Sequence, residues 1–207
     1  MTGGINKRMK TGILGGTFDP PHNGHLEIGR VVLEELCLDR VIFMVAGSPQ
    51  LKRNPVITPA EQRMAMTELA VSDEEAFEAS SLEVRRSGAT YTAQTLAEIE
   101  KQGGGRDELY FIIGMDNLTS LHRWHKPGEI IKKSILVVVP RPEEAGPDIG
   151  QLENEIPGIT RRLIMLNRPL ITISASDIRR KASRGEDISC LVPQKVAEYI
   201  KQNHLYV

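Results

Sequence analysis

Residues 12–25 read GILGGTFDPPHNGH: a short apolar strand, a glycine pair, a proline-rich turn and two histidines. Gly15 and Gly16 carry no side chain, so a ligand can approach the backbone closely there. The helix predicted to follow offers unpaired N–H groups and a partial positive charge to an anion. His22 and His25 are three positions apart, so both imidazoles project from one side of its first turn. The stretch therefore predicts an anion-binding site at the carboxyl end of a buried strand.

Strands and helices alternate along the rest of the chain. Near-continuous apolar runs are typical of strands buried on both faces of a parallel sheet. Such runs predict strands at 11–14, 41–46, 109–113, 135–139 and 163–166. Helical spacing of apolar residues predicts helices at 24–36, 59–71, 92–101, 176–183 and 193–202. The alternation predicts an α/β fold: a Rossmann-like, doubly wound, mainly parallel sheet with helices on both faces and a small C-terminal helical segment.

The length of 207 residues favours one domain with elaborations. Residues 10–207 are predicted to form it, with 176–207 as the helical segment, and residues 1–9 to form a disordered tail. Residues 140–158 are rich in proline, glycine and acidic side chains, which predicts one long loop.

Composition excludes several classes of partner. The formal net charge is −1, so the chain has no global field for nucleic acid, and an anionic ligand must meet a local basic site. No apolar run approaches the ~20 residues that span a bilayer, and the first residues lack a secretory signal. Two cysteines far apart in sequence, Cys37 and Cys190, are expected to stay reduced. These features predict a cytoplasmic protein without nucleic-acid or membrane partners, and they leave a homo-oligomer open.

A second helix start suited to anions lies in residues 173–180, ISASDIRR. Ser176 is predicted as the N-cap, with Asp177 in the first turn and Arg179 three residues beyond the cap. The serine hydroxyls and the guanidinium would then point to the same side of the helix start.

Two common site types are disfavoured by spacing. No G-x-G-x-x-G follows the first strand, which weighs against an NAD-binding oxidoreductase. No third Cys, His or carboxylate is spaced to complete a metal site with His22 and His25, so no protein-held metal is predicted.

Together, residues 16–25 and 173–180 resemble the nucleotidyltransferase superfamily, marked by G-x-F-D-P-x-H-x-G-H and I-S-[SA]-[ST]-x-I-R segments. The resemblance implies that His22, His25 and Arg179 are catalytic. The histidines hold the ATP phosphates, His25 meets charge developing on the α-phosphoryl group, and Arg179 grips the phosphates that leave as pyrophosphate. The ATP-binding residues it implies are Gly15, Gly16, Thr17, Phe18, His22, His25, Gly114, Asp116, Ser174, Ser176 and Arg179.

Three further segments, GATYTAQTL at 88–96, FIIGMD at 111–116 and LHRWH at 121–125, resemble the bacterial nicotinate-nucleotide adenylyltransferases. This likeness implies adenylyl transfer from ATP to nicotinate mononucleotide in NAD biosynthesis, by in-line attack of the mononucleotide phosphate on the α-phosphorus, with Mg²⁺ accompanying ATP. Such a transfer needs alignment and charge neutralisation more than covalent chemistry. The mononucleotide-binding residues it implies are Asp19, Lys52, Tyr91, Thr92, Trp124 and Arg141.

The sequence departs from the family at residues 48–53, SPQLKR, where members often have Pro-Pro-His-Lys. Lys52 keeps the basic position, but Leu51 replaces the histidine. Two other functions stay open on the motifs. One is another small-molecule nucleotidyltransferase, such as a phosphopantetheine adenylyltransferase or a cytidylyltransferase. The other is a non-catalytic nucleotide-binding protein, which need not keep both histidines and Arg179. A class I tRNA synthetase would need an anticodon-reading region for which this length leaves no room.

Overall fold

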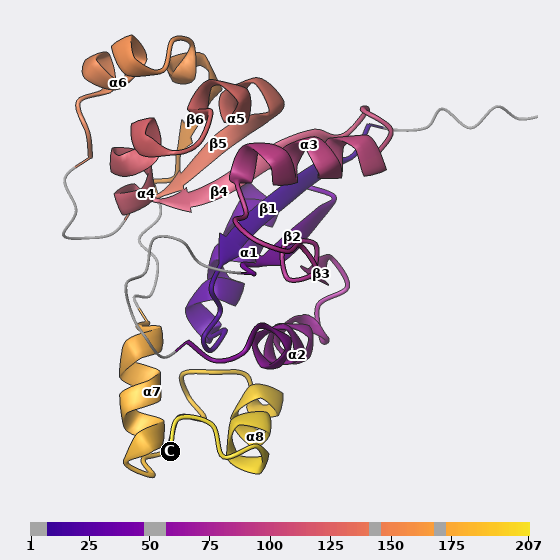
Figure 1. The fold of residues 1–207 in the computed structure, drawn as a ribbon, viewed down its shortest axis with the longest axis vertical. Helices are drawn as coiled ribbons and strands as arrows, with labels where there is room; N and C mark the ends of the chain where they lie inside the picture. The colour runs from indigo at the N-terminus through magenta and orange to yellow at the C-terminus, as the bar shows by residue number, and fades with distance from the viewer. Residues whose placement is uncertain (1–7, 48–56, 141–145, 168–172) are drawn as a thin grey trace, which may run out of the picture.

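The computed structural model describes residues 8–47, 57–140, 146–167 and 173–207. Its centre is a six-stranded sheet with the order β3-β2-β1-β4-β5-β6, in which every neighbouring pair is parallel (Figure 1). The strands are β1 (Lys10–Gly16), β2 (Arg40–Val45), β3 (Phe77–Ser80), β4 (Glu108–Gly114), β5 (Ser134–Val139) and β6 (Leu163–Met165). The chain leaves β1 in one direction and returns to its other side as β4. Ligands bind open α/β sheets beside such a switch point, at the carboxyl ends of the strands.

Helices cover both faces of the sheet. They are α1 (Asn23–Glu35), α2 (Ala60–Val71), α3 (Thr92–Gln102), α4 (Met115–Ser120), α5 (Pro127–Lys133), α6 (Ile149–Glu155), α7 (Ala175–Ser183) and α8 (Gln194–Gln202). The short 3₁₀ helices η1 (Leu121–Arg123) and η2 (Ile159–Arg162) follow α4 and α6. Within the described residues, none of these helices combines the length and the apolar character needed to cross a membrane. The predicted Rossmann-like α/β fold with a C-terminal helical segment is confirmed.

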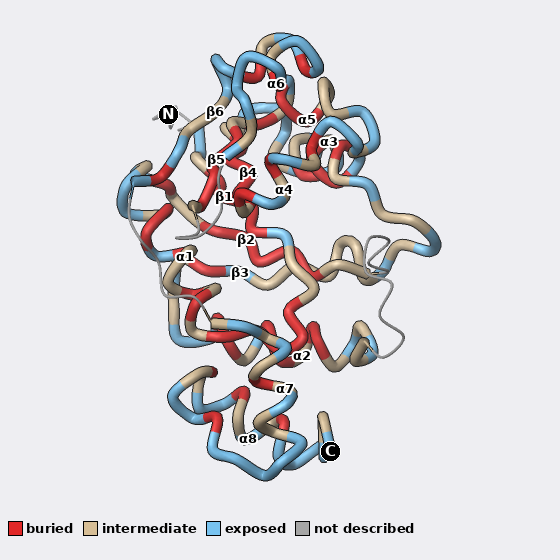
Figure 2. Tube along the Cα trace, turned by 90° about the vertical axis from the view of Figure 1, so that its left-hand side faces the viewer, coloured by how far each residue is buried: buried red, intermediate tan, exposed pale blue. Residues whose placement is uncertain are grey.

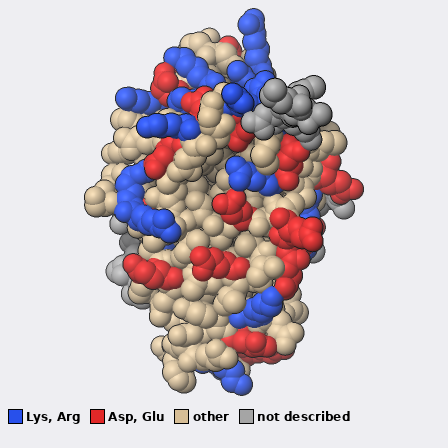
Figure 3. Space-filling model, turned by 90° about the vertical axis from the view of Figure 1, so that its right-hand side faces the viewer, with Lys and Arg blue, Asp and Glu red and all other residues tan. Residues whose placement is uncertain are grey.

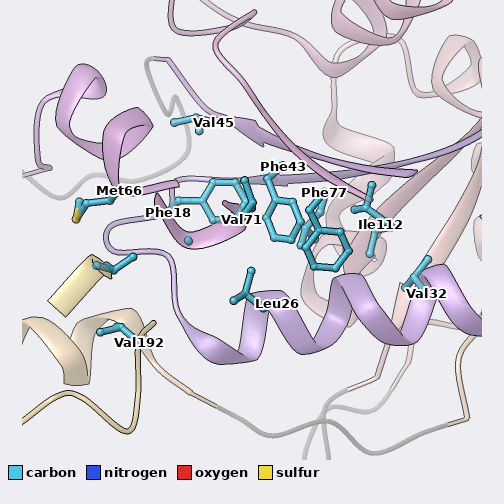
Figure 4. Close-up of a cluster of buried hydrophobic side chains, with 14 of the residues drawn as sticks. Phe18, Leu26, Val32, Phe43, Val45, Met66, Val71, Phe77, Ile112 and Val192 are labelled. Carbon is cyan, nitrogen blue, oxygen red and sulfur yellow. The ribbon is translucent and has the colours of Figure 1, made fainter. Parts of the chain in front are cut away.

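The apolar strands divide their side chains between two cores. Successive strand residues point to opposite faces, so Ile13 and Ile42 join one core while Leu14 and Phe43 join the other. The core that contains Leu14 is covered by α1, α2, α7 and α8, and Figure 4 shows its Phe18, Phe43 and Phe77 rings side by side. Figure 2 shows that buried residues follow the strands through the middle of the molecule. Burial on both faces explains the continuous apolar runs in the sequence.

The structure contains elements that the sequence pattern did not predict. β3 has a single buried residue, Phe77, in four, too few for a recognisable pattern. The prediction of one long loop over 140–158 was wrong where α6 forms: the Asp148 carboxylate caps this helix by accepting from the Gly150 and Gln151 amides, and Leu152 is buried. The short helices α4 and α5 were also missed. Most of the predicted disordered tail, residues 1–7, lies outside the described part of the chain.

Gly29 sets the distance between α1 and the sheet. A Cβ at this position would lie 2.9 Å from Phe77 Cζ and 3.0 Å from Phe43 Cζ, so the missing side chain lets the helix approach the two rings. We expect Gly29→Ala to destabilise the protein by about 1–3 kcal/mol through overpacking. Gly128, in α5, is the matched control because a Cβ there meets nothing within 4 Å. Gly128→Ala should add up to about 1 kcal/mol of stability. Urea unfolding measures both; equal effects of the two substitutions would contradict the packing argument.

Candidate active site

The histidine pair lies at the start of α1. His22 is the N-cap residue of this helix, and its backbone N–H donates to His25 Nδ1 at 3.2 Å. The two imidazole rings stack with centroids 3.6 Å apart and an angle of 17° between their planes. The Phe18 ring meets the His25 ring edge-on, with centroids 4.9 Å apart. Both histidines therefore lie on one side of the first turn, as their spacing predicted.

The His22 ring is buried and incompletely satisfied. It is 6% exposed, and its Nδ1 has no hydrogen-bond partner among the described residues. Burial lowers the pKa of His22 to about 4, so the ring is neutral at pH 7. A buried polar nitrogen without a partner costs free energy that a bound ligand can recover.

The two glycines differ in their surroundings. A Cβ on Gly16 would lie 2.8 Å from Phe18 Cζ, so the space at Gly16 is filled by the protein's own phenyl ring. Phe18 reaches that position with a left-handed backbone, φ +50°, and is itself only 2% exposed. Gly15 is exposed, and the atom nearest to a Cβ there is Phe111 Cε2 at 3.7 Å. Close approach of a ligand to the backbone is therefore unobstructed at Gly15.

The second predicted anion-binding turn meets the first. Arg179, on α7, donates from Nη1 to the Asp19 carbonyl oxygen at 2.6 Å, although the two residues are 160 positions apart in sequence. Its Nη2 donates to Ser176 Oγ at 3.2 Å. The N-cap of α7 is Ser174, whose hydroxyl accepts from the Asp177 amide at 3.4 Å. The prediction of Ser176 as the cap was wrong by two residues, because the helix begins earlier and leaves the Ser176 hydroxyl to Arg179.

Three residues that the motif analysis did not identify, Thr58, Arg63 and Tyr206, hydrogen-bond to the segment that precedes the histidines. The Asp19 carboxylate is 4% exposed; its Oδ1 accepts from the Tyr206 hydroxyl at 2.8 Å and its Oδ2 from the Thr58 amide at 3.3 Å. Arg63, on α2, is 1% exposed. Its guanidinium donates to four backbone carbonyls: Thr17 and Ala46 at 2.7 Å, Thr58 at 2.9 Å and Gly47 at 3.0 Å. Burial lowers the pKa of Arg63, against the favourable charge of nearby Asp19.

One signal for Arg63 was present in the sequence. It lies four residues before Thr67 and seven before Ala70, which places a charged residue on the buried face of α2. A cation among buried positions needs several acceptors, and the carboxyl ends of β1 and β2 supply them.

Tyr91, Thr92 and Trp124, which are predicted to bind the mononucleotide, lie at the start of α3 and at the end of η1. Tyr91 is the N-cap residue of α3, followed by Thr92, and its ring lies 4.3 Å from the His125 ring. Trp124 packs its ring edge-on against Phe111, at 6.2 Å, and its buried Nε1 has no hydrogen-bond partner in the described part of the chain. The Tyr91 ring therefore lies against the residue that directly follows Trp124 in the chain.

The structure describes only some of the other residues that were predicted to contact the substrates. Gly114 ends β4 and is the N-cap residue of α4, and Asp116 is exposed in the first turn of that helix. Lys52 and Arg141 lie outside the described residues. Acidic and basic side chains are interspersed over the face in Figure 3, with Lys and Arg most frequent toward its upper end. The formal net charge of −1 gives the chain no global field of one sign, so phosphate groups must be met by individual side chains such as Arg179.

Comparison with known proteins gives consistent matches. The model of the cytidylyltransferase-like family matches residues 13–181. A probable nicotinate-nucleotide adenylyltransferase of Dehalococcoides mccartyi is 46% identical over 198 residues, covering 96% of this chain and 97% of the relative. A protein of the same description from Roseiflexus sp. is 41% identical over 195 residues, covering 94% and 96% of the two chains.

Solved structures share the fold. The Plasmodium falciparum nicotinic acid mononucleotide adenylyltransferase complexed with NaAD superposes with a TM-score of 0.77 and 18% identity, covering 96% of this chain and 98% of that one. A putative nicotinate-nucleotide adenylyltransferase from Vibrio parahaemolyticus gives a TM-score of 0.66 at 21% identity.

Proposed function

Because the chain belongs to the cytidylyltransferase-like family and, within it, to the nicotinate-nucleotide adenylyltransferases, we propose that it transfers the adenylyl group of ATP to nicotinate mononucleotide. The products are nicotinate adenine dinucleotide and pyrophosphate, in a step of NAD biosynthesis. The observation that carries this proposal is the hydrogen bond from Arg179 to the Asp19 carbonyl, which brings together the two helix starts that are predicted to bind anions.

In the proposed reaction an oxygen of the mononucleotide phosphate attacks the α-phosphorus of ATP in line. A new P–O bond forms as the bond to the β-phosphate oxygen breaks, and pyrophosphate leaves. No covalent enzyme intermediate is needed, so the protein contributes alignment and charge stabilisation. We assign the His25 ring to the α-phosphate, where charge develops, and the neutral His22 ring beside it to phosphate hydrogen bonding.

The leaving group has its own set of donors in this scheme. Arg179, with the hydroxyls of Ser174 and Ser176, binds the β- and γ-phosphates, and its contact with Ser176 Oγ orients the guanidinium. Gly114 and Asp116 contact the nucleotide ribose, at the carboxyl end of the strand next to β1.

The nicotinate mononucleotide lies on the Tyr91 side of the site in our proposal. Trp124 stacks on the pyridine ring, and the start of α3 at Tyr91 and Thr92 receives its carboxylate through backbone amides. Lys52 and Arg141 remain predictions for the phosphate. Asp19 contributes through its main chain and its buried carboxylate, whose two oxygens both accept from the protein.

We assign Mg²⁺ to the ATP phosphates rather than to a protein cage. Among the residues with described positions, no group of three His, Cys, Asp or Glu side chains could hold a metal ion. When bound with ATP, Mg²⁺ neutralises triphosphate charge. We place the reaction in the cytoplasm, which fits the two unpaired cysteines.

The proposal is tested by measuring pyrophosphate release from ATP with nicotinate mononucleotide, nicotinamide mononucleotide and phosphopantetheine in turn. Turnover with nicotinate mononucleotide supports it. Turnover with phosphopantetheine alone would identify a different adenylyltransferase, and binding of ATP without turnover on any acceptor would identify a nucleotide-binding protein.

Replacing Trp124 tests the stacking role. Trp124→Ala should raise KM for the mononucleotide roughly tenfold, about 1.4 kcal/mol, because a stacked ring pair is lost. KM for ATP should stay within about twofold, because the ATP contacts lie on other elements. Trp124→Phe is the matched control: it keeps a ring and should restore much of the mononucleotide affinity. A rise in KM for ATP instead would refute the assignment. Steady-state kinetics with each substrate varied in turn makes the measurement.

A further inference from the structure

We propose that Tyr206, the penultimate residue, is a positioning residue for adenylyl transfer, acting through Asp19 on Arg179. The inference rests on the proposed function for its assay. The hydrogen bonds of the Tyr206 hydroxyl go to Asp19 and Met66, so its proposed effect on Arg179 passes through Asp19.

The connection runs through two hydrogen bonds on Asp19. The Tyr206 hydroxyl donates to Asp19 Oδ1 at 2.8 Å, and the carbonyl of Asp19 accepts from Arg179 Nη1 at 2.6 Å. Burial, and then the charge of Asp19, raise the pKa of the Tyr206 phenol, so this hydroxyl stays protonated and remains a donor. The Asp19 residue therefore links the end of the chain to the guanidinium that we assign to the leaving pyrophosphate.

The backbone at the end of the chain is shaped to deliver this hydroxyl. His204 and Tyr206 have left-handed conformations, with φ of +50° and +68°, which are uncommon for residues with side chains. Leu205 and Tyr206 both pack against the core that α1 and α2 cover. An unfavourable backbone persists when the surrounding contacts determine it, and here those contacts direct the phenol toward Asp19.

The Tyr206 hydroxyl is one of two donors that hold the Asp19 carboxylate. The Thr58 amide holds Oδ2 at 3.3 Å, a longer contact than the 2.8 Å from Tyr206 to Oδ1. Without the hydroxyl, Oδ1 loses the donor that orients the side chain. The Asp19 peptide carbonyl, and with it Arg179, then loses its fixed position. Small misplacements of groups that align reactants can cost up to about 100-fold in rate.

Tyr206→Phe removes only the hydroxyl, and Tyr199→Phe makes the same chemical change on α8, at a residue packed against the same core. We expect kcat to fall about tenfold in Tyr206→Phe, with KM for the mononucleotide within about twofold of wild type. Tyr199→Phe should stay within about twofold in both parameters. The assays are run at a temperature where circular dichroism shows that all variants are folded. Loss of folded protein then cannot cause a fall in kcat. A kcat within twofold of wild type in Tyr206→Phe would overturn the proposal.

A double-mutant cycle distinguishes positioning of Arg179 from a general effect. In an Arg179→Lys background, adding Tyr206→Phe should lower kcat by less than about twofold, because the group it positions is already altered. A further tenfold loss in that background would show that Tyr206 does not act through Arg179. The acceptor used is whichever mononucleotide the wild type turns over, so failure of nicotinate mononucleotide refutes the proposed function and leaves this comparison intact.

Discussion

His25→Ala should lower kcat for pyrophosphate release by about 100-fold or more, the size typical of losing one preorganised donor at the reacting centre. Two neighbouring rings hold the His25 ring in place before any substrate binds. It stacks on His22 at 3.6 Å and lies edge-on to Phe18 at 4.9 Å, so it has little freedom to lose on binding. KM for either substrate should change much less than kcat, because the interaction strengthens in the transition state.

The two ring nitrogens of His25 can be tested separately. Nδ1 accepts from the His22 backbone N–H at 3.2 Å and so helps to cap α1, and our proposal gives Nε2 to the α-phosphate. Asparagine places a polar atom near the Nδ1 position, and glutamine places one near Nε2. His25→Asn should therefore recover the stability lost in His25→Ala, about 1 kcal/mol, but not kcat. His25→Gln should recover part of kcat. Full turnover in folded His25→Ala would reject His25 as a transition-state contact.

The largest expected loss of stability comes from Arg63→Met. This substitution keeps an unbranched apolar stem but removes the donors to the carbonyls of Thr17, Ala46, Gly47 and Thr58. It also removes the cation beside the buried Asp19 carboxylate. Removing one partner from a buried charged group with several hydrogen bonds lowers the free energy of unfolding by about 3–5 kcal/mol. Urea or thermal unfolding should show a loss of that size.

Arg30 provides the matched control for Arg63. It donates from Nε to Glu74 Oε1 at 2.7 Å, but its side chain is 54% exposed. Exposed ion pairs contribute about 0–1 kcal/mol, so Arg30→Met should be nearly neutral. Arg63→Lys should recover little, because a single ammonium cannot reproduce the planar set of donors. A loss below about 1 kcal/mol in Arg63→Met would show that the four carbonyls find water or other partners without cost.

The fold was predictable because the sequence patterns that indicate its strands and helices are local. Apolar runs such as those of β2 and β5 reveal strands buried on both faces, and most of the long helices carry periodic apolar faces. Elements with few buried residues were not predicted, because they carry no apolar pattern; β3, for example, buries only Phe77. α6 is begun by the Asp148 cap and buries only Leu152, so its surroundings look like a polar loop. The sequence offers two serines, Ser174 and Ser176, that could both cap α7, and the backbone conformation makes Ser174 the N-cap.

The placement of the two histidine rings was predictable from neighbouring residues, because the spacing of His22 and His25 brings both rings to one turn of the helix. What holds those groups was not readable. Tyr206 reaches Asp19 from 187 positions away and Arg179 from 160, and no local pattern records which distant donor will satisfy a buried carboxylate or carbonyl. Those pairings arise only when the sheet and its covering helices bring the distant segments together. A buried polar atom without a partner costs free energy, so the folded structure is stable only where a donor or acceptor from another segment lies next to it.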